Sequence, residues 1–518
     1  MAEPLHDLLR DRLIRTRAPD GAERAETLPG IFARLGGDDI ASFPALQPHQ
    51  SHAWFAFLVQ LAGIALHRAG ETDPALPEAA WAERLLALTA GAAEPWSLVV
   101  PGLDRPAFLQ PPVPEGTLDG FKNRIEHPDA LDVLVTTKLH DVKSARIAEP
   151  DPEHWVYALV SLQTMQGFSG RDNYGVVRMN GGFGNRPCVA YTPSLSWGPR
   201  FRRDLAILLA ERPKMVAGYG YAHRDGVALQ WLEPWDGRTA IPLSRCDPFF
   251  IEVCRRVRFE GDSGGRVVAR IAPSKTKRTA VPVDNGDTGD PWTPLRHKDN
   301  AALTLDGSGF TYRRLHQLLF GNEFRLGAAG RVQRDDPERL LLVARAMVRG
   351  QGKTEGLHER VVEIPGHVRS RLADPDEFER LAAVAKQRIE IVAQIDRQIL
   401  NPALCVLLQG GPDKARLDDK RTRRWRDRFD AAVDAEFFHS LWGALDDLED
   451  SEIQWVKLLH RLAKVQLEDA IRSAPIPDAR RYRAVAAAER VFGGGFRNRF
   501  PEVFQSNERS ADELAPTA

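Results

Sequence analysis

The C-terminal third of the chain contains four segments whose apolar residues recur at three- and four-residue spacing. They span residues 374–408, 423–448, 451–473 and 477–492, with Asp, Ser or Pro near their starts. Amphipathic helices bury their apolar faces against one another, and short connections make neighbouring helices antiparallel. The four segments therefore predict an antiparallel four-helix bundle over residues 366–500.

The rest of the chain must fold separately, because 518 residues are too many for one core. With 43% hydrophobic and 27% charged residues, the composition is that of a globular protein. Residues 1–365 are expected to form a large mixed α/β domain with irregular loops, and the polar tail 501–518 to be disordered. The predicted fold class is therefore α+β, with the mixed domain first and the bundle second.

Within the N-terminal domain, residues 49–68 have apolar side chains at helical spacing between Pro48 and Gly70 and predict a buried helix. Residues 200–300 alternate short apolar runs with turns and are expected to be mostly strands. These strands are 227–232, 249–253 and 266–271. A further helix is expected over 338–348.

Charge and cysteine content exclude several classes of protein. The net charge is −1, from 70 basic and 71 acidic residues, so a polyanion would have to be met by local basic patches. The 4 cysteines form neither a disulfide framework nor a zinc knuckle. No signal-peptide core begins the sequence, and no window reaches about 18 uninterrupted apolar residues. We expect a cytoplasmic protein without a membrane span.

Glycine, arginine and asparagine crowd together in residues 162–193, LQTMQGFSGRDNYGVVRMNGGFGNRPCVAYTP. Glycine allows positive φ and lets backbone N–H groups approach a ligand, while arginine and asparagine donate to phosphates or groove edges. The stretch is typical of a backbone-led contact surface. It is equally consistent with a system of turns that joins strands.

Two motifs suggest chemistry but are incomplete. Gly352, Lys353 and Thr354 match the end of the phosphate-binding pattern G-x-x-x-x-G-K-[ST], yet Met347 stands where its first glycine belongs. A P-loop-like NTPase remains the alternative function. His140-Asp141 resembles the metal pair of an HD nuclease, but no further ligands accompany it. His49, His52 and His67 are too dispersed to supply the three or four convergent ligands of a zinc site.

Basic loops are the remaining candidates for contact with nucleic acid. They are the 138–146 segment, the turn PSKTKR at 273–278, and residues 414–428, where eight of fifteen residues are basic. Each could also be a solvated surface, in the last case with i, i+4 ion pairs to acids.

Taken in order, several motifs resemble the CasA family, the large subunit of the type I-E CRISPR surveillance complex Cascade. They are HQSHAWFAFLVQLAGIALH, PAFLQ, LQTMQGFSGRDNYGVVRMNGGFGNRP, ALQWLEPWDGRTAIPLSRCDPF and RGQGKTEGLHER, followed by the helical bundle. The resemblance covers nearly the whole chain. It implies a non-catalytic subunit that recognises the short protospacer-adjacent motif (PAM) of target double-stranded DNA, helps to unwind the duplex, and docks a helicase–nuclease.

The resemblance also implies which residues meet nucleic acid. The family's glycine loop matches Gly167, Phe168, Ser169 and Gly170, and its hairpin wedge matches Gln351, Gly352, Lys353 and Thr354. Its lysine finger matches Lys275 or Lys277. A loop that faces the guide RNA and the other Cascade subunits matches Lys138, His140, Lys143 and Arg146. Some members hold zinc near the positions of Cys246 and Cys254. Since only two cysteines stand there, no metal and no cofactor are expected.

Physical chemistry agrees with these implied roles. The minor groove distinguishes A·T from G·C and little more, so shape, backbone approach and one or two long side chains suffice to read it. Unstacking the first base pair costs on the order of a few kcal/mol, which pairing between guide and target offsets.

Overall fold

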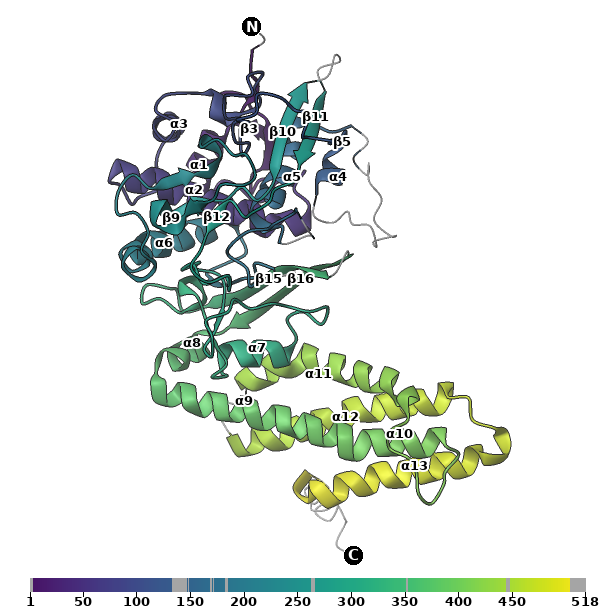
Figure 1. Ribbon diagram of the computed structural model, residues 1–518. Helices are drawn as coiled ribbons and strands as arrows, with labels where there is room; N and C mark the ends of the chain where they lie inside the picture. Colours follow the sequence, from purple (N-terminus) through teal and green to yellow (C-terminus); the bar gives the residue numbers. More distant parts are fainter. Residues whose placement is uncertain are drawn as a thin grey trace, which may run out of the picture. The chain divides into compact units, whose positions relative to one another are not determined.

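The computed structural model describes residues 3–132, 147, 149–167, 170, 172–181, 185–261, 266–350, 353–443 and 448–503. It divides into two units. Unit 1 comprises the residues up to Phe310 together with Asn322–Ile364, and unit 2 comprises Thr311–Gly321 and the residues from Pro365 onward. The predicted fold class is confirmed, since unit 1 mixes strands with helices and unit 2 is helical (Figure 1).

Unit 1 is built around one large apolar core. Its helices are α1 (Leu28–Gly36), α2 (Ser51–Ala69), α3 (Glu78–Ala87), α4 (Pro128–Leu131), α5 (Pro152–Met165) and α6 (Trp197–Tyr219). Helix α2 is the expected buried helix; it ends at Gly70, whose φ of +73° is the left-handed conformation that glycine adopts readily. Helix α2 contacts α5, α6 and strand β9, so it is the central element of the core.

The strands of unit 1 form several small sheets instead of one large one. They are β1 (Leu5–Asp7), β2 (Ile14–Arg17), β3 (Glu23–Glu26), β4 (Ser97–Val99), β5 (Asn123–Ile125), β6 (Cys188–Thr192), β7 (Val227–Leu229), β8 (Ile241–Pro242), β9 (Cys246–Ile251), β10 (Arg256–Gly261), β11 (Val267–Ala272), β12 (Thr279–Ala280), β13 (Leu295–Arg296), β14 (Phe324–Arg325), β15 (Leu340–Gly350) and β16 (Lys353–Ile364). Among the described residues, two sheets have three strands, in the orders β10-β11-β5 and β16-β15-β6.

One prediction for unit 1 is wrong, and another is wrong in part. Residues 338–348 were expected to be helical, but Leu340–Gly350 is strand β15, the central strand of its sheet. A strand covered on both faces has a continuous apolar run, which its sequence alone does not distinguish from a buried helix. Residues 200–300 were expected to be mostly strands, but the first 20 belong to the long helix α6. The three strands expected at 227–232, 249–253 and 266–271 do overlap β7, β9 and β11.

Unit 2 is a bundle of long antiparallel helices, as its sequence predicts. Its elements are α7 (Tyr312–Leu319), α8 (Gly366–Ala373), α9 (Pro375–Ile395), α10 (Asn401–Leu408), α11 (Arg423–Gly443), α12 (Leu448–Ser473) and α13 (Asp478–Arg499). A π-helical turn, Asp396–Leu400, joins α9 to α10. Helix α10 packs on α13, and α11 packs on α12. The short helix α7 groups with this unit although it precedes β15 in the chain.

Within the described residues, the continuous helical stretch Pro375–Leu408 is the one with the length and apolarity of a membrane span. About two thirds of its most apolar window, 67%, is buried inside the bundle. The apolar composition of this helical stretch is therefore explained by its burial in the core of unit 2.

Candidate nucleic-acid interface

The glycine loop begins where α5 ends. Gly167 is buried, and its carbonyl accepts a hydrogen bond from the Arg255 guanidinium at 2.9 Å. Gly170 has a φ of +101°, and a Cβ built on it would meet no other atom within 4 Å. The loop therefore needs glycine at 170 for its backbone conformation, and it leaves open space beside that residue. Phe168 and Ser169 lie outside the described residues.

A buried arginine holds both ends of this loop. The Arg255 guanidinium donates to the carbonyls of Gly167 and Tyr174, and to its own neighbour Cys254. Its backbone N–H donates to Gln163 Oε1 at 2.8 Å, which ties the same point to helix α5. Burial lowers the pKa of Arg255, because desolvation disfavours its charged form. Carbonyl dipoles thus stabilise this cation and fix the base of the loop.

The turn at 273–278 lies directly beside the glycine loop. Lys275 Nζ is 2.7 Å from Asp172 Oδ1, and the N–H of Ser274 donates to the Asp172 carbonyl at 2.9 Å. On the other side, the N–H of Lys275 donates to the Gly237 carbonyl at 2.6 Å. The structure therefore brings together two candidate DNA-binding segments that lie about one hundred residues apart in the sequence.

The two candidate lysines differ in their surroundings. The Lys275 side chain is 57% exposed at the glycine loop, whereas the Lys277 side chain is 18% exposed and forms an ion pair with Asp284. Asp284 in turn lies against Gly181, in the later half of the glycine-rich stretch. Lys275 is thus the lysine beside Gly167–Gly170 that solvent, and hence a ligand, can reach.

The predicted wedge belongs to a long antiparallel hairpin. Strands β15 and β16 pair from Leu340↔Ile364 to Gly350↔Lys353, with an irregularity between Val348 and Arg349. Gln351 and Gly352 lie outside the described residues, and Lys353 and Thr354 begin strand β16. A P-loop requires a helix after its lysine, so the strand here argues against the alternative of an NTPase.

Two buried aspartates make hydrogen bonds on either side of the segment expected to face guide RNA. Lys138, His140, Lys143 and Arg146 lie outside the described residues. Before this segment, Asp132 accepts hydrogen bonds from His49 Nε2 at 2.7 Å and Gln50 Nε2 at 2.6 Å. After it, the N–H of Ile147 donates to Asp129 Oδ2 at 2.8 Å. His49 therefore serves as a hydrogen-bond partner of a buried carboxylate.

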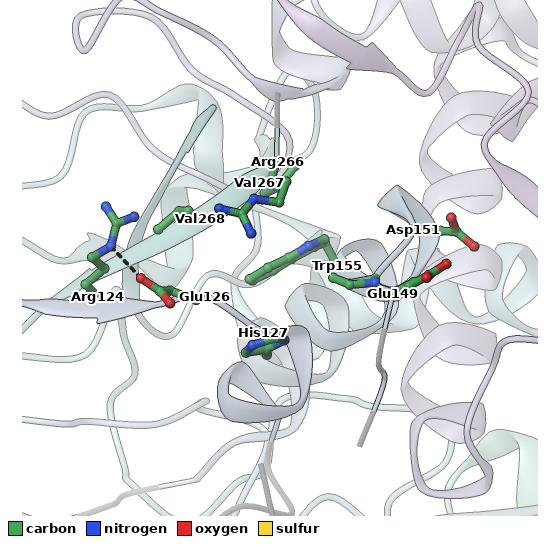
Figure 2. A pocket seen from close by; sticks show the side chains of 10 residues that line it. Arg124, Glu126, His127, Glu149, Asp151, Trp155, Arg266, Val267 and Val268 are labelled. Carbon is green, nitrogen blue, oxygen red and sulfur yellow. Dashed lines mark hydrogen bonds and ion pairs between the residues drawn. The ribbon is translucent and has the colours of Figure 1, made fainter. Parts of the chain in front are cut away.

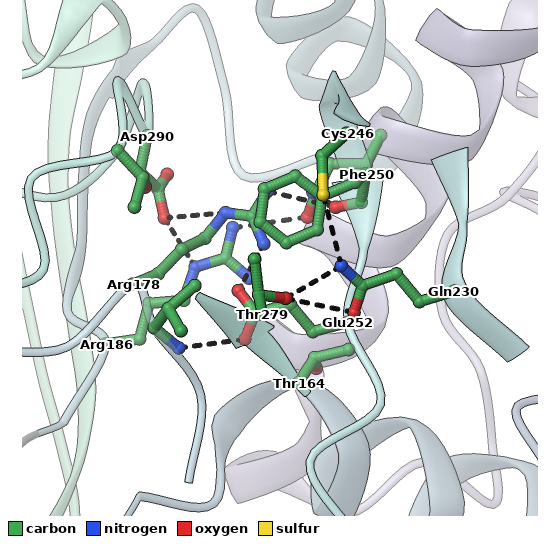
Figure 3. Close-up of polar contacts among 12 residues, drawn as sticks. Thr164, Arg178, Arg186, Gln230, Cys246, Phe250, Glu252, Thr279 and Asp290 are labelled. Atoms are coloured by element: carbon green, nitrogen blue, oxygen red, sulfur yellow. Dashed lines mark hydrogen bonds and ion pairs between the residues drawn. The ribbon is translucent and has the colours of Figure 1, made fainter. Parts of the chain in front are cut away.

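The later half of the glycine-rich stretch is part of the core. Arg178 stacks on the Phe250 ring at 3.9 Å and forms an ion pair with Glu252, and Arg186 Nε is 2.6 Å from Asp290 Oδ2 (Figure 3). All four charged side chains are at most 5% exposed. Buried and paired in this way, the two arginines hold strands and loops together instead of facing a ligand.

Cys246 and Cys254, near the positions where some family members hold zinc, make hydrogen bonds within the protein. Cys254 Sγ donates to the Leu162 carbonyl at 2.8 Å, and Cys246 Sγ lies 3.6 Å from Gln230 Nε2. Both are buried, and burial raises the pKa of the Cys246 thiol to about 12. Among the described residues, no three His, Cys, Asp or Glu side chains converge as metal ligands would.

Four of the eight basic residues in the run 414–428 of unit 2 form ion pairs with acids. The pairs are Arg421–Asp419 at 2.6 Å, Arg423–Asp427 at 3.3 Å, Arg426–Asp396 at 2.5 Å and Arg428–Asp469 at 3.1 Å. Arg424 stacks on the ring of Trp425 at 3.8 Å. These contacts agree with the interpretation of the run as a solvated helix surface.

A cavity that the sequence did not indicate lies beside β5, α5 and β11 (Figure 2). Its volume is about 440 Å³. Trp155, Val267 and Val268 supply its apolar part, and charged side chains surround them: Arg124, Glu126, Glu149, Asp151 and Arg266. No sequence signal marks it, because its lining residues come from three distant segments.

The fold is that of a mixed α+β unit followed by a helical bundle, with a glycine loop and a lysine turn in contact. Compared by sequence, no protein-family model matches the chain, and no curated protein matches it. Solved structures do match. Cse1 from Acidimicrobium ferrooxidans superposes with a TM-score of 0.65 at 17% identity, covering 100% of both chains.

Other structures agree. CasA from Thermus thermophilus has a TM-score of 0.62 at 16% identity, covering 94% of this chain and 98% of that one. A chain from a CRISPR RNA-guided surveillance complex has a TM-score of 0.61 at 14% identity, covering 95% and 100%. At these identities the likeness establishes the fold: this chain has the CasA/Cse1 fold from end to end.

Proposed function

We propose that this chain is the large subunit of a type I-E CRISPR surveillance complex. The observation that carries the proposal is the fold likeness to Cse1 over 100% of both chains. Two dissimilar units, in the same order and over the same length, make a more specific likeness than one common domain would. The partners would be guide RNA, the other Cascade subunits, target double-stranded DNA and a recruited helicase–nuclease. The subunit would be non-catalytic and would act in the cytoplasm.

Within this complex, the glycine loop and Lys275 would read the PAM from the minor groove. The minor-groove edges of A·T pairs present only acceptors, and an ammonium group offers three donors. Lys275 Nζ already donates to an acceptor, the Asp172 carboxylate, at 2.7 Å. A phosphate or base acceptor could replace that carboxylate without movement of the backbone. The open space at Gly170 would let the duplex approach the loop closely.

The β15–β16 hairpin would open the duplex next to the PAM. Its strands remain paired as far as Gly350↔Lys353, so the end of a two-stranded ribbon would enter between base pairs. The cost of unstacking would be offset as guide RNA pairs with the target strand. This assigns the wedge role to Gln351, Gly352, Lys353 and Thr354.

The two lysines permit a matched test of PAM recognition. We expect Lys275→Met, which keeps the aliphatic stem, to weaken binding of a PAM-containing duplex by the assembled complex about tenfold. The salt dependence of log K should fall by about one unit of slope, because one cation no longer meets the DNA. Duplex binding measured at several salt concentrations checks both numbers.

Lys277→Met is the control, since its ammonium is paired with Asp284 and mostly covered. It should bind DNA as the unaltered complex does. A larger loss in Lys277→Met than in Lys275→Met would move the assignment to Lys277. Full binding by both variants would refute a lysine contact with the PAM. If the chain did not assemble with the other Cascade subunits and guide RNA at all, the proposed function itself would be wrong.

A further inference from the structure

The turn Asp306–Gly309 packs unusually closely on strand β16. Gly309 has a φ of +67°, and a Cβ built on it would overlap His358 Nδ1 and lie 2.8 Å from His358 Cγ. At Gly307 an added Cβ would overlap the Glu355 carboxylate. The N–H of Gly309 donates to the Asp306 carbonyl at 3.1 Å, which closes the turn. Glycine at 309 is therefore required both for backbone conformation and for close approach.

His358 stands where the hairpin leaves its sheet. Strand β6 pairs with β15 from Leu341↔Thr192 to Arg345↔Cys188, whereas β15 and β16 continue to pair as far as Gly350↔Lys353. Among the described residues, the part of the hairpin beyond Arg345 is thus a two-stranded ribbon. His358 pairs with Ala346, the first residue past the end of β6.

A two-stranded ribbon has little stability of its own, so its direction is set by what packs against it. Ala346, Met347 and Val348 of β15 are buried, and on β16 the turn Asp306–Gly309 meets Glu355 and His358. From His358 to Lys353 is five residues, or roughly 17 Å along the strand. A side chain at 309 would push His358 away by roughly 1 Å, since carbon atoms normally stay about 3.5–4.0 Å apart. The displacement at the far end of the ribbon would be larger than at its base.

We propose that the turn Asp306–Gly309 sets the direction of the β15–β16 hairpin, and that Gly309 is a positioning residue for the hairpin's contact with duplex DNA. This inference rests on the proposed function of the hairpin. Gly309 touches no DNA in this scheme; it acts through the ring of His358.

The test uses the assembled complex with Gly309→Ala. We expect at least a roughly tenfold loss of affinity for a PAM-containing duplex, and a smaller ratio between PAM-containing and PAM-lacking duplexes. Gly70→Ala is the matched control. Gly70 has a similar φ of +73°, but a Cβ there would meet nothing within 4 Å, so this variant carries the backbone strain without the steric overlap. It should leave the PAM ratio unchanged.

A second substitution separates positioning from general damage to the fold. In Gly309→Ala/His358→Ala the methyl group no longer meets a ring, so duplex binding and the PAM ratio should recover most of what Gly309→Ala loses. Equal losses in Gly309→Ala and Gly70→Ala, or no recovery in the double variant, would overturn the inference. Thermal unfolding should show both glycine variants folded at the temperature of the binding assay, with Gly309→Ala the less stable because it adds the overlap to the strain.

Alanine replacement of Gln351–Thr354 distinguishes failure of this inference from failure of the proposed function. If that replacement weakens PAM-dependent binding while Gly309→Ala does not, the hairpin contacts DNA but the turn does not position it. If that replacement itself binds DNA normally, the role proposed for the hairpin fails, and the inference fails with it.

Discussion

In unit 1, loops, strands and one helix are joined by buried ion pairs, whereas in unit 2 helices meet along apolar side chains. Arg178–Glu252, Arg186–Asp290 and Arg212–Asp247 are all buried in unit 1, the last with two contacts of 2.8 Å. In the described part of unit 2, Arg388 is the buried charged side chain. It donates to Ser440 Oγ at 2.9 Å, and burial lowers its pKa to about 10.

The difference follows from backbone geometry. A helix satisfies its own backbone hydrogen bonds, so helices can pack with little more than apolar contact. The short strands and irregular loops of unit 1 leave buried carbonyls that need donors. Arg178 donates to Phe250 in β9, and Arg255 donates to Gly167 and Tyr174 in loops. Arginine in this chain is therefore often a structural residue. An arginine-rich stretch is thus weak evidence for a nucleic-acid surface.

The substitution with the largest expected effect on the free energy of unfolding breaks a buried ion pair of unit 1. Arg178→Ala leaves Glu252 buried without its cation and removes the donor to the Phe250 carbonyl, so unfolding should cost about 3–5 kcal/mol less. Chemical denaturation followed by tryptophan fluorescence measures the change. Arg423→Ala, at an exposed i, i+4 pair, is the control and should change stability by less than about 0.5 kcal/mol. Similar values for both would show that the buried pairs do not hold unit 1 together.

A core substitution in unit 2 should cost slightly less. Leu404 in α10 is fully buried, and Leu404→Ala should lower the free energy of unfolding by about 2–4 kcal/mol through lost burial and a cavity. Because the defect is apolar, its effect should not depend on salt. Leu417→Ala, at a leucine that is 55% exposed, is the matched control. If Leu404→Ala were as mild as Leu417→Ala, the bundle would not depend on apolar packing.

The smallest expected effect concerns pH. Burial, reinforced by Arg345 and Arg186, lowers the pKa of His52 to about 3 from an ordinary value of 6.5. Below about pH 6.5 the unfolded chain binds a proton at His52 that the folded chain does not. The contribution of neutral His52 to the free energy of unfolding is therefore fully present above that pH, and it is lost as the pH is lowered toward about 3. Between about pH 7 and pH 5, His52 should account for about 2 kcal/mol of lost stability.

The comparison of His52→Gln with the unaltered chain isolates this contribution. Glutamine does not titrate, so the variant should lose about 2 kcal/mol less than the unaltered chain between about pH 7 and pH 5. Parallel stability curves for the two proteins over this range would contradict the expected pH dependence.

Sequence patterns alone determined the bundle and the central helix of unit 1. Residues 374–408, 423–448, 451–473 and 477–492 correspond closely to α9–α10, α11, α12 and α13, because helical periodicity is a local property. Helix α2 can be recognised from the sequence just as readily, since its apolar run lies between Pro48 and Gly70.

Only the tertiary structure decided the conformation of residues 340–350 and the surroundings of the two candidate lysines. Residues 340–350 are a strand because β6 and β16 flank them, and an apolar run by itself is also compatible with a helix. Lys275 and Lys277 are two residues apart in sequence and each pairs with an aspartate, yet Lys275 is 57% exposed beside the glycine loop whereas Lys277 is 18% exposed. Burial and pairing depend on residues far along the chain, so no local pattern carries that information.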